Sequence, residues 1–289
     1  MSDSLVSLLT ALGDDELVLG HRHSEWTGHA PHLEEDVAFS SIAQDEIGHA
    51  AAYYSLLATQ TGDDPDRLGL GRAADEYRHA ILCERENRDW AYTLARHWLY
   101  DRADDIRLEV LEQSANDDLA ALATKLRREE RYHLLHADTW MRRVSLGPVE
   151  GRARLMEGVT DAFADAAGLF EPIDLEEEAV KEGWLPAPSD ELRDRFYKHT
   201  TTVLDELGLP TAVSSSEDAR AEFVASSSGD LIAGDGEGMA PPGAEFGVGD
   251  VQHEQRPGLG GRRGRHTEEF QELWDVMTVT YREHPGASW

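Results

Sequence analysis

Two pairs of metal-binding residue types share one spacing in this chain. Glu46 and His49 form one pair, and Glu130 and His133 form the other. Residues three apart in an α-helix lie on one face, a turn apart, so each pair directs a carboxylate and an imidazole the same way. Two such pairs, joined by one carboxylate from each of two further helices, form a ligand set that holds two metal ions in a four-helix bundle.

Two single carboxylates lie at matching distances from these pairs. Glu16 precedes Glu46 by 30 residues, and Asp101 precedes Glu130 by 29. Two copies of a helical hairpin would give this near-equality. An oxygen-rich ligand set with few nitrogens suits iron or manganese better than zinc or copper. The predicted metal ligands are Glu16, Glu46, His49, Asp101, Glu130 and His133.

Ion pairing within the core is the alternative interpretation of these carboxylates. Arg131 or His23 would then neutralise a buried Glu. A buried carboxylate without a partner is costly, which favours metal binding for the paired positions. Glu76 and His79 repeat the spacing but have no mate at the matching distance, so we interpret them as a chance or surface pair. His23 is expected to be a core histidine with satisfied nitrogens.

Long helices must position these side chains. Apolar residues recur every three or four positions over residues 1 to about 147, which predicts four amphipathic helices and an all-α fold. The first ends at Gly28 and the second before Thr61, the third spans about 86–114, and the fourth begins at Asn116 and ends at Gly147. Further helices are expected around 149–170, around 189–207 and after Thr267.

The composition changes after the sixth predicted helix. Runs of Ser, Gly and Pro over 211–262 are typical of a flexible, solvated linker. The predicted organisation is a helical domain over 1–210, a flexible insertion over 211–262, and a C-terminal helix over 263–289 that packs back on the bundle.

Charge and cysteine content exclude several functions. Lys+Arg number 27 and Asp+Glu 57, giving a net charge of −30, which disfavours nucleic-acid and membrane partners. No apolar run is long enough to span a bilayer and the N-terminus lacks a basic region, so a cytoplasmic protein is expected. The single cysteine, Cys83, excludes a cysteine-held zinc or iron–sulfur site. Scarce lysine beside abundant carboxylates suggests the hypothesis of life in concentrated salt.

Three stretches of the chain resemble the PaaC-type subunit of ring-1,2-phenylacetyl-CoA epoxidase. They are the opening Leu12–Leu19 with Glu25–Pro31, then Glu130–Leu134, and finally Gly260–Glu268. The resemblance covers residues 5–210 and 256–289. It implies a ferritin-like four-helix bundle with additional C-terminal helices, in a complex that inserts one oxygen atom into the aromatic ring of phenylacetyl-CoA.

The resemblance also implies partners. In the family, the catalytic iron is held by a homologous sister subunit, and a separate flavin/iron–sulfur reductase supplies electrons from NADPH. No electron-transfer motif occurs in this chain, which fits that division of labour. We therefore expect a subunit of the phenylacetyl-CoA epoxidase, acting as the structural partner of the catalytic chain. A self-sufficient di-iron oxygenase, or a ferroxidase of the iron-storage kind, is the alternative.

The chain departs from the family pattern at its candidate ligands. PaaC-type chains commonly have lost several of them, whereas all six candidates are present here. Either the chain is a structural subunit with an ancestral site intact, or it binds iron itself. Arg262, Arg263 and Arg265 are a local cationic cluster. They are candidate contacts for CoA phosphates or an acidic neighbouring subunit, and ion pairs within the chain are the alternative.

Overall fold

The structure is a computed structural model that describes residues 2–211, 258–284 and 287. Most of the expected 211–262 insertion, from 212 to 257, lies outside the described residues. All regular elements of the described part are helices, which confirms the all-α prediction.

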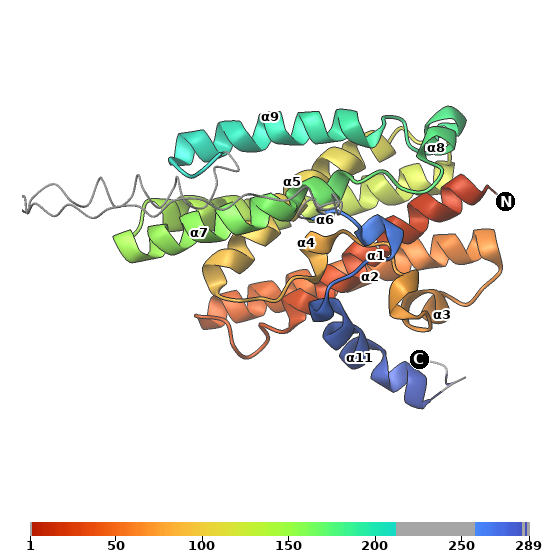
Figure 1. Cartoon of the computed structure of the whole chain (residues 1–289), viewed down its shortest axis with the longest axis horizontal. Coiled ribbons are helices and arrows are strands. Elements are labelled where there is room, and N and C mark those ends of the chain that lie inside the picture. The colour runs from red at the N-terminus through yellow and green to blue at the C-terminus, as the bar shows by residue number, and fades with distance from the viewer. Residues whose placement is uncertain (1, 212–257, 285–286, 288–289) are drawn as a thin grey trace, which may run out of the picture.

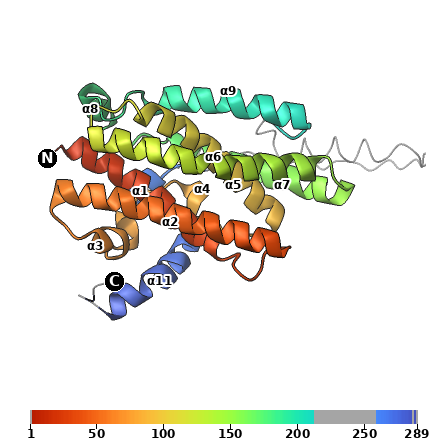
Figure 2. The same cartoon turned by 180° about the vertical axis from the view of Figure 1, so that it is seen from behind.

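Four long helices form the bundle, as the periodicity predicts. They are α1 (Asp3–Ser24), α2 (Leu33–Thr61), α5 (Trp90–Leu111) and α6 (Asp117–Ser145). α1 packs along α2, and α5 packs along α6 (Figures 1 and 2). Side-chain caps begin three of them: Ser2 accepts from the N–H of Leu5, Asp89 from Tyr92 and Asn116 from Leu119. The third helix is shorter than predicted because its cap is at Asp89 rather than near residue 86.

Short elements join the two hairpins. α3 (Pro65–Leu70), the 3₁₀ turn η1 (Ala74–Glu76) and α4 (Ile81–Glu84) lie between α2 and α5. The sequence periodicity does not reveal them because each is two turns or less. α3 nevertheless has a clear start, with Asp64 as its cap and Pro65 in its first turn.

Three further helices follow the bundle, together with a 3₁₀ turn. They are α7 (Val149–Asp165), η2 (Ala166–Phe170), α8 (Glu176–Glu182) and α9 (Ser189–Leu207). Both α7 and α9 pack on α5. Gly158 lets α7 approach closely, because a Cβ there would lie 2.8 Å from the Cα of Tyr92.

The C-terminal segment returns to the N-terminal half. It contains the 3₁₀ turn η3 (Gly261–Arg263) and α11 (Glu268–Glu283), which contacts α3, η1 and α4 (Figure 1). Residues 258–262, which composition assigns to the flexible insertion, pack tightly here: a Cβ on Gly261 would lie 2.1 Å from the carbonyl oxygen of His79. Every helix in the described ranges is too short or too polar to cross a membrane.

Candidate metal centre

Five of the six predicted ligands meet in the bundle core. Glu16 comes from α1, Glu46 and His49 from α2, and Glu130 and His133 from α6. Each is at most 2 % exposed. Their ligand atoms form two groups, Glu16 with Glu46 and His49, and Glu46 with Glu130 and His133, each within 4.8 Å. The three-residue spacing therefore brings the pairs together across two helices, as predicted.

Glu46 and Glu130 lie between the two imidazoles. The Nδ1 of His49 is 3.7 Å from Glu46 Oε2 and 3.4 Å from Glu130 Oε1. The Nδ1 of His133 is 3.5 Å from Glu46 Oε1 and 3.1 Å from Glu130 Oε1. Glu16 approaches His49 alone, with Oε2 3.5 Å from Nδ1. Two shared carboxylates and one imidazole on each side form the pattern of a dinuclear site.

The atoms that face this centre lack hydrogen-bond partners. They are Glu16 Oε2, both carboxylate oxygens of Glu46 and of Glu130, and the Nδ1 atoms of His49 and His133. Burying polar atoms without partners costs free energy, and burying carboxylate charge costs more. Divalent cations would satisfy all of these atoms, so the residues present fit a metal centre.

Two partly exposed carboxylates orient the histidines. The Nε2 of His49 donates to Glu129 Oε2 at 3.0 Å, and that of His133 donates to Asp45 Oδ2 at 3.3 Å. Because its Nε2 proton is held by a carboxylate, each imidazole turns Nδ1 toward the centre, where Nδ1 can bind a metal ion once its own proton has left, as in carboxylate–histidine–metal arrangements. The carboxylate that orients each histidine comes from the other helix: Glu129 of α6 bonds His49 of α2, and Asp45 of α2 bonds His133 of α6.

The sequence contains a pattern that could have revealed these orienting carboxylates, but the high content of acidic residues obscures it. An acid directly precedes the Glu of each pair, at Asp45 and Glu129. In a chain with 57 acidic residues, one more acid beside a Glu attracts no notice.

The negative charges packed into this centre raise the pKa values of its own groups. Burial, together with the charges of Glu16 and Glu130, raises the pKa of Glu46 well above its ordinary value. Burial would lower the pKa of His49, but its interaction with Glu16 and Glu130 outweighs this and raises the pKa to about 9. Protons thus stay on this cluster because negative charge is in excess, which is the condition that favours cation binding.

Asp101 does not join the cluster. It is fully buried on α5, and its Oδ2 lies 3.2 Å from His97 Nδ1. Neither of its oxygens accepts a hydrogen bond, and burial raises its pKa to about 7. The neighbouring Tyr100 contacts the centre instead, donating from its hydroxyl to Glu16 Oε1 at 3.0 Å. A role for Asp101 as a ligand stays a prediction.

The ion-pair alternative finds no support in the two residues considered for it. Arg131 is exposed and forms no ion pair with the described residues. His23 is completely buried, but both ring nitrogens lack hydrogen-bond partners, so the expectation of a satisfied core histidine is wrong. It packs against the rings of Phe39 and His97, and burial keeps its pKa well below 6.5.

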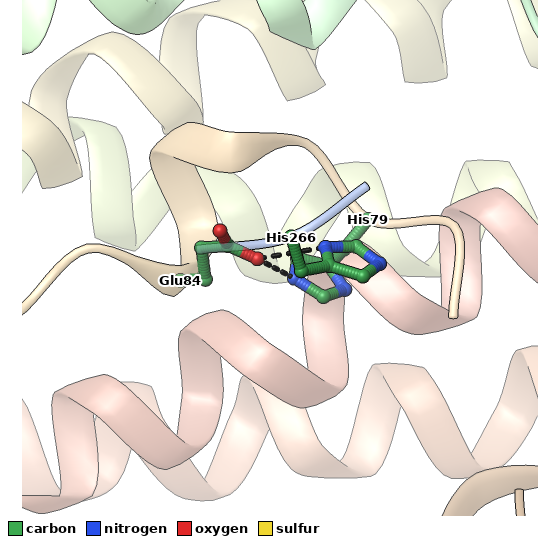
Figure 3. Close-up of side chains that lie close together, drawn as sticks. All are labelled: His79, Glu84 and His266. Atoms are coloured by element: carbon green, nitrogen blue, oxygen red, sulfur yellow. Dashed lines mark hydrogen bonds and ion pairs between the residues drawn. The ribbon is translucent and has the colours of Figure 1, made fainter. Parts of the chain in front are cut away.

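A second buried cluster lies outside the centre (Figure 3). The interpretation of Glu76 and His79 as a surface pair is wrong for His79, which is fully buried. One oxygen of Glu84 accepts from His79 Nε2 at 2.6 Å and from His266 Nδ1 at 2.8 Å. The two rings are 4.1 Å apart and inclined by only 13°. Because they are nearly parallel, an ion in the plane of one ring would lie well off the plane of the other.

This cluster fastens the C-terminal segment. The other oxygen of Glu84 accepts from the backbone N–H of Thr267 at 2.7 Å, at the start of α11. His266 Nε2 donates to the carbonyl of Tyr77 at 3.0 Å. We call His79, Glu84 and His266 the C-terminal clasp.

The three arginines of the predicted cationic cluster separate. Arg262 is 3 % exposed and pairs with the buried Asp15, with Nη2 2.6 Å from Oδ2. It is committed to the interior and cannot face a ligand in solution. Arg263 forms an exposed ion pair with Asp174, and Arg265 is exposed. For these two, contact with CoA or a partner stays a prediction.

Two comparisons bear on the identity of the chain. A family model described as phenylacetic acid catabolic protein matches residues 1–222. The C-type subunit of the 1,2-phenylacetyl-CoA epoxidase of Escherichia coli (strain K12) is 27% identical over 288 residues, which cover 99% of this chain and 100% of that protein. The family match contains all four bundle helices and all the residues of the candidate metal centre.

Proposed function

The chain belongs to the phenylacetic acid catabolic protein family, and we propose that it is the C-type subunit of a multicomponent 1,2-phenylacetyl-CoA epoxidase. Similarity along the full length of the corresponding Escherichia coli protein supports this assignment. The ferritin-like, all-α bundle agrees with it. The iron-storage alternative is not favoured, because both comparisons lead to phenylacetate proteins.

The proposed role requires other proteins. A homologous catalytic subunit would act on phenylacetyl-CoA, and a separate flavin/iron–sulfur reductase would deliver electrons. The chain has a single cysteine, and Cys83 is completely buried. It therefore has no cysteine cluster of its own for electron transfer.

We further propose that this subunit binds two metal ions in its own core, with iron favoured by the oxygen-rich ligand set. Glu16, Glu46, His49, Glu130 and His133 would hold the ions. When bound, two such ions would supply Lewis-acid chemistry, and iron would add one-electron redox chemistry fed by the reductase. The chain's part is to hold the ligands dry and oriented, with Glu129 and Asp45 keeping each imidazole proton on Nε2.

One observation carries the metal proposal: five carboxylate oxygens and two imidazole nitrogens are buried facing one another without hydrogen-bond partners. It is tested by loading the purified chain with ferrous ion under anaerobic conditions and measuring metal by plasma mass spectrometry. We expect about two irons per chain, lost in a Glu46→Gln/Glu130→Gln variant and kept in Glu34→Gln, an exposed control on the same helix. Wild-type protein without metal would make the chain a scaffold.

The role in a complex is tested separately. Mixed with the catalytic subunit, the chain should elute as a defined hetero-complex in gel filtration. Epoxidation of phenylacetyl-CoA, followed with the reductase and NADPH present, should require both subunits. A large homo-oligomeric cage that ignores the catalytic subunit would instead indicate iron storage.

A further inference from the structure

The outer surface of α6 differs in charge from the rest of this acidic chain. From Ala121 to Arg142 its outermost residues at helical spacing are cationic, apolar or neutral, and the partly exposed acids Glu129 and Asp138 are paired with His49 and Arg102. The stripe consists of Ala121, Lys125, Arg128, Tyr132, Leu135, Thr139 and Arg142, with Arg131 beside it. Asp and Glu supply 57 of the 289 residues. Arg128 and Arg131 form no ion pair within the described part of the chain, so their charge is available to another molecule.

Large apolar side chains accompany these arginines. Tyr132 is 75 % exposed and Leu135 is 63 % exposed. On α2, Val37 is 65 % exposed. The pairs His49–Glu129 and His136–Glu35 show that α2 and α6 run antiparallel. Val37 of α2 therefore lies near the part of α6 that carries Leu135. Such a concentration of exposed apolar groups marks an interaction surface.

The neighbouring surface of α2 is small and nearly uncharged. Its exposed residues after Val37 include Ser41, Gln44, Gly48 and Ala51, and a Cβ added to Gly48 would meet no atom within 4 Å. Asp45 is the acid in this stretch, and its carboxylate is bonded to His133. Small side chains let another helix approach closely.

We propose that this surface docks against an acidic, helical surface of a partner subunit. We define it as the α2–α6 face, made of Val37, Ser41, Gly48, Arg128, Arg131, Tyr132 and Leu135; α2 and α6 lie on the side turned to the viewer in Figure 2. The inference rests on the proposed function, which makes the catalytic subunit that partner. Tyr and Arg are the residue types that anchor protein interfaces, and the guanidinium groups fit carboxylates.

Charge favours a different protein over a second copy of this chain. In a two-fold dimer through this face both sides would present the same unpaired Arg128 and Arg131. The acids of the face, Asp45 and Glu129, are already bonded to His133 and His49. The stripe from Lys125 to Arg142 is about 26 Å long, at 1.5 Å per residue.

Docking here would also cover the supports of the metal centre. Asp45 and Glu129, which orient the two ligand histidines, have side chains that are 49 % and 40 % exposed on this side of the bundle. A partner seated on the α2–α6 face would exclude water from both carboxylates.

The test measures affinity of the full chain for the catalytic subunit by calorimetry and gel filtration. Two face variants are compared, Tyr132→Asp/Leu135→Asp and Arg128→Glu/Arg131→Glu, with Val276→Asp/Arg67→Glu as a matched control on α11 and α3. We expect each face variant to bind at least about tenfold more weakly, and the control to bind as wild type. Equal melting temperatures would show that all variants are folded.

The other outcomes are distinct. If the wild type binds and both face variants bind equally well, the docking face is wrong and the proposed function stands. If the wild type does not bind at all, both fall. Sedimentation with phosphatidylserine vesicles is the second arm: vesicle binding that needs Arg128 and Arg131, with binding to the catalytic subunit unchanged, would overturn the proposal in favour of a membrane surface.

Discussion

Replacing Arg262 by Ala should destabilise the protein far more than replacing its neighbour Arg263. The Arg262 guanidinium is buried and donates to both oxygens of Asp15, from Nη1 at 2.8 Å and from Nη2 at 2.6 Å. It also donates to the carbonyl of Arg78 at 2.7 Å. Arg263 pairs with Asp174 at the surface, where its side chain is 39 % exposed.

The structure sets the size of the two effects. Removing one member of a buried ion pair typically costs about 3–5 kcal/mol, because the other charge is left in the interior. Asp15 keeps Arg107, 3.0 Å away, and the N–H of Ala80 at 2.8 Å, so we expect the lower end, about 3 kcal/mol. That corresponds to a melting temperature lower by roughly 6–12 °C. An exposed pair contributes about 0–1 kcal/mol, so Arg263→Ala should be close to neutral.

The assay is thermal unfolding of both variants by circular dichroism, with limited proteolysis to detect release of the C-terminal segment. Within the C-terminal segment from 258 onward, Arg262→Ala should become susceptible to the protease at temperatures where Arg263→Ala stays protected. Equal stability of the two variants would refute the assignment of Arg262 to the core, and would return it to the exposed cationic cluster that the sequence suggests.

Three further measurements address the clasp, the helix packing and the metal centre. Burial would raise the pKa of Glu84, but interactions with His266 and His79 outweigh it and hold the pKa at about 2, below the ordinary 4.5. The ionised carboxylate therefore stabilises the fold above pH 4.5, and this stabilisation is lost as the pH falls toward 2. In thermal melts Glu84→Gln should be about 3 kcal/mol less stable than wild type at pH 7, and the same difference at pH 2–3 would contradict this reasoning. Gly158→Ala should lower the free energy of unfolding in urea by about 1–3 kcal/mol, because the new Cβ pushes α7 away from the backbone of α5. Gly48→Ala is the control and should not destabilise the protein, because the space around Gly48 is open. Similar losses of stability in the two variants would show that the close approach at Gly158 is not decisive. Glu129→Gln and Asp45→Asn should each weaken metal binding about 10–100-fold in chelator competition without lowering the melting temperature of the metal-free protein, and undiminished affinity would argue against their orienting role.

Helical periodicity predicted most of the centre because it fixes which residues share a face. The i, i+3 spacing alone orients Glu46 with His49 and Glu130 with His133, and the near-equal separations place Glu16 level with them. Asp101 shows the limit of this reasoning. Periodicity placed it on the buried face of α5, but its short side chain lies against His97, and contact with Glu16 comes from Tyr100.

Contacts between distant segments could not be predicted from local patterns. His79 and His266 are 187 residues apart, and Asp15 and Arg262 are 247 apart. The sequence around Arg262 does not distinguish it from Arg263. The two differ because the η3 turn directs Arg262 toward α1 and Arg263 toward the surface. The short helices α3 and α4 do not show in the periodicity for a related reason, because each has too few residues to complete a period.

The C-terminal clasp and the Asp15–Arg262 pair have a consequence for how the chain tolerates alteration. Both ends of the 212–257 stretch join segments that are anchored independently, α9 on α5 and the residues from 258 onward on the N-terminal half. The protein is therefore suited to being split there: a fragment ending near residue 211 and a second beginning near 258 carry complementary buried charges, and would reassemble when mixed. An inserted reporter domain should be accepted at the same place.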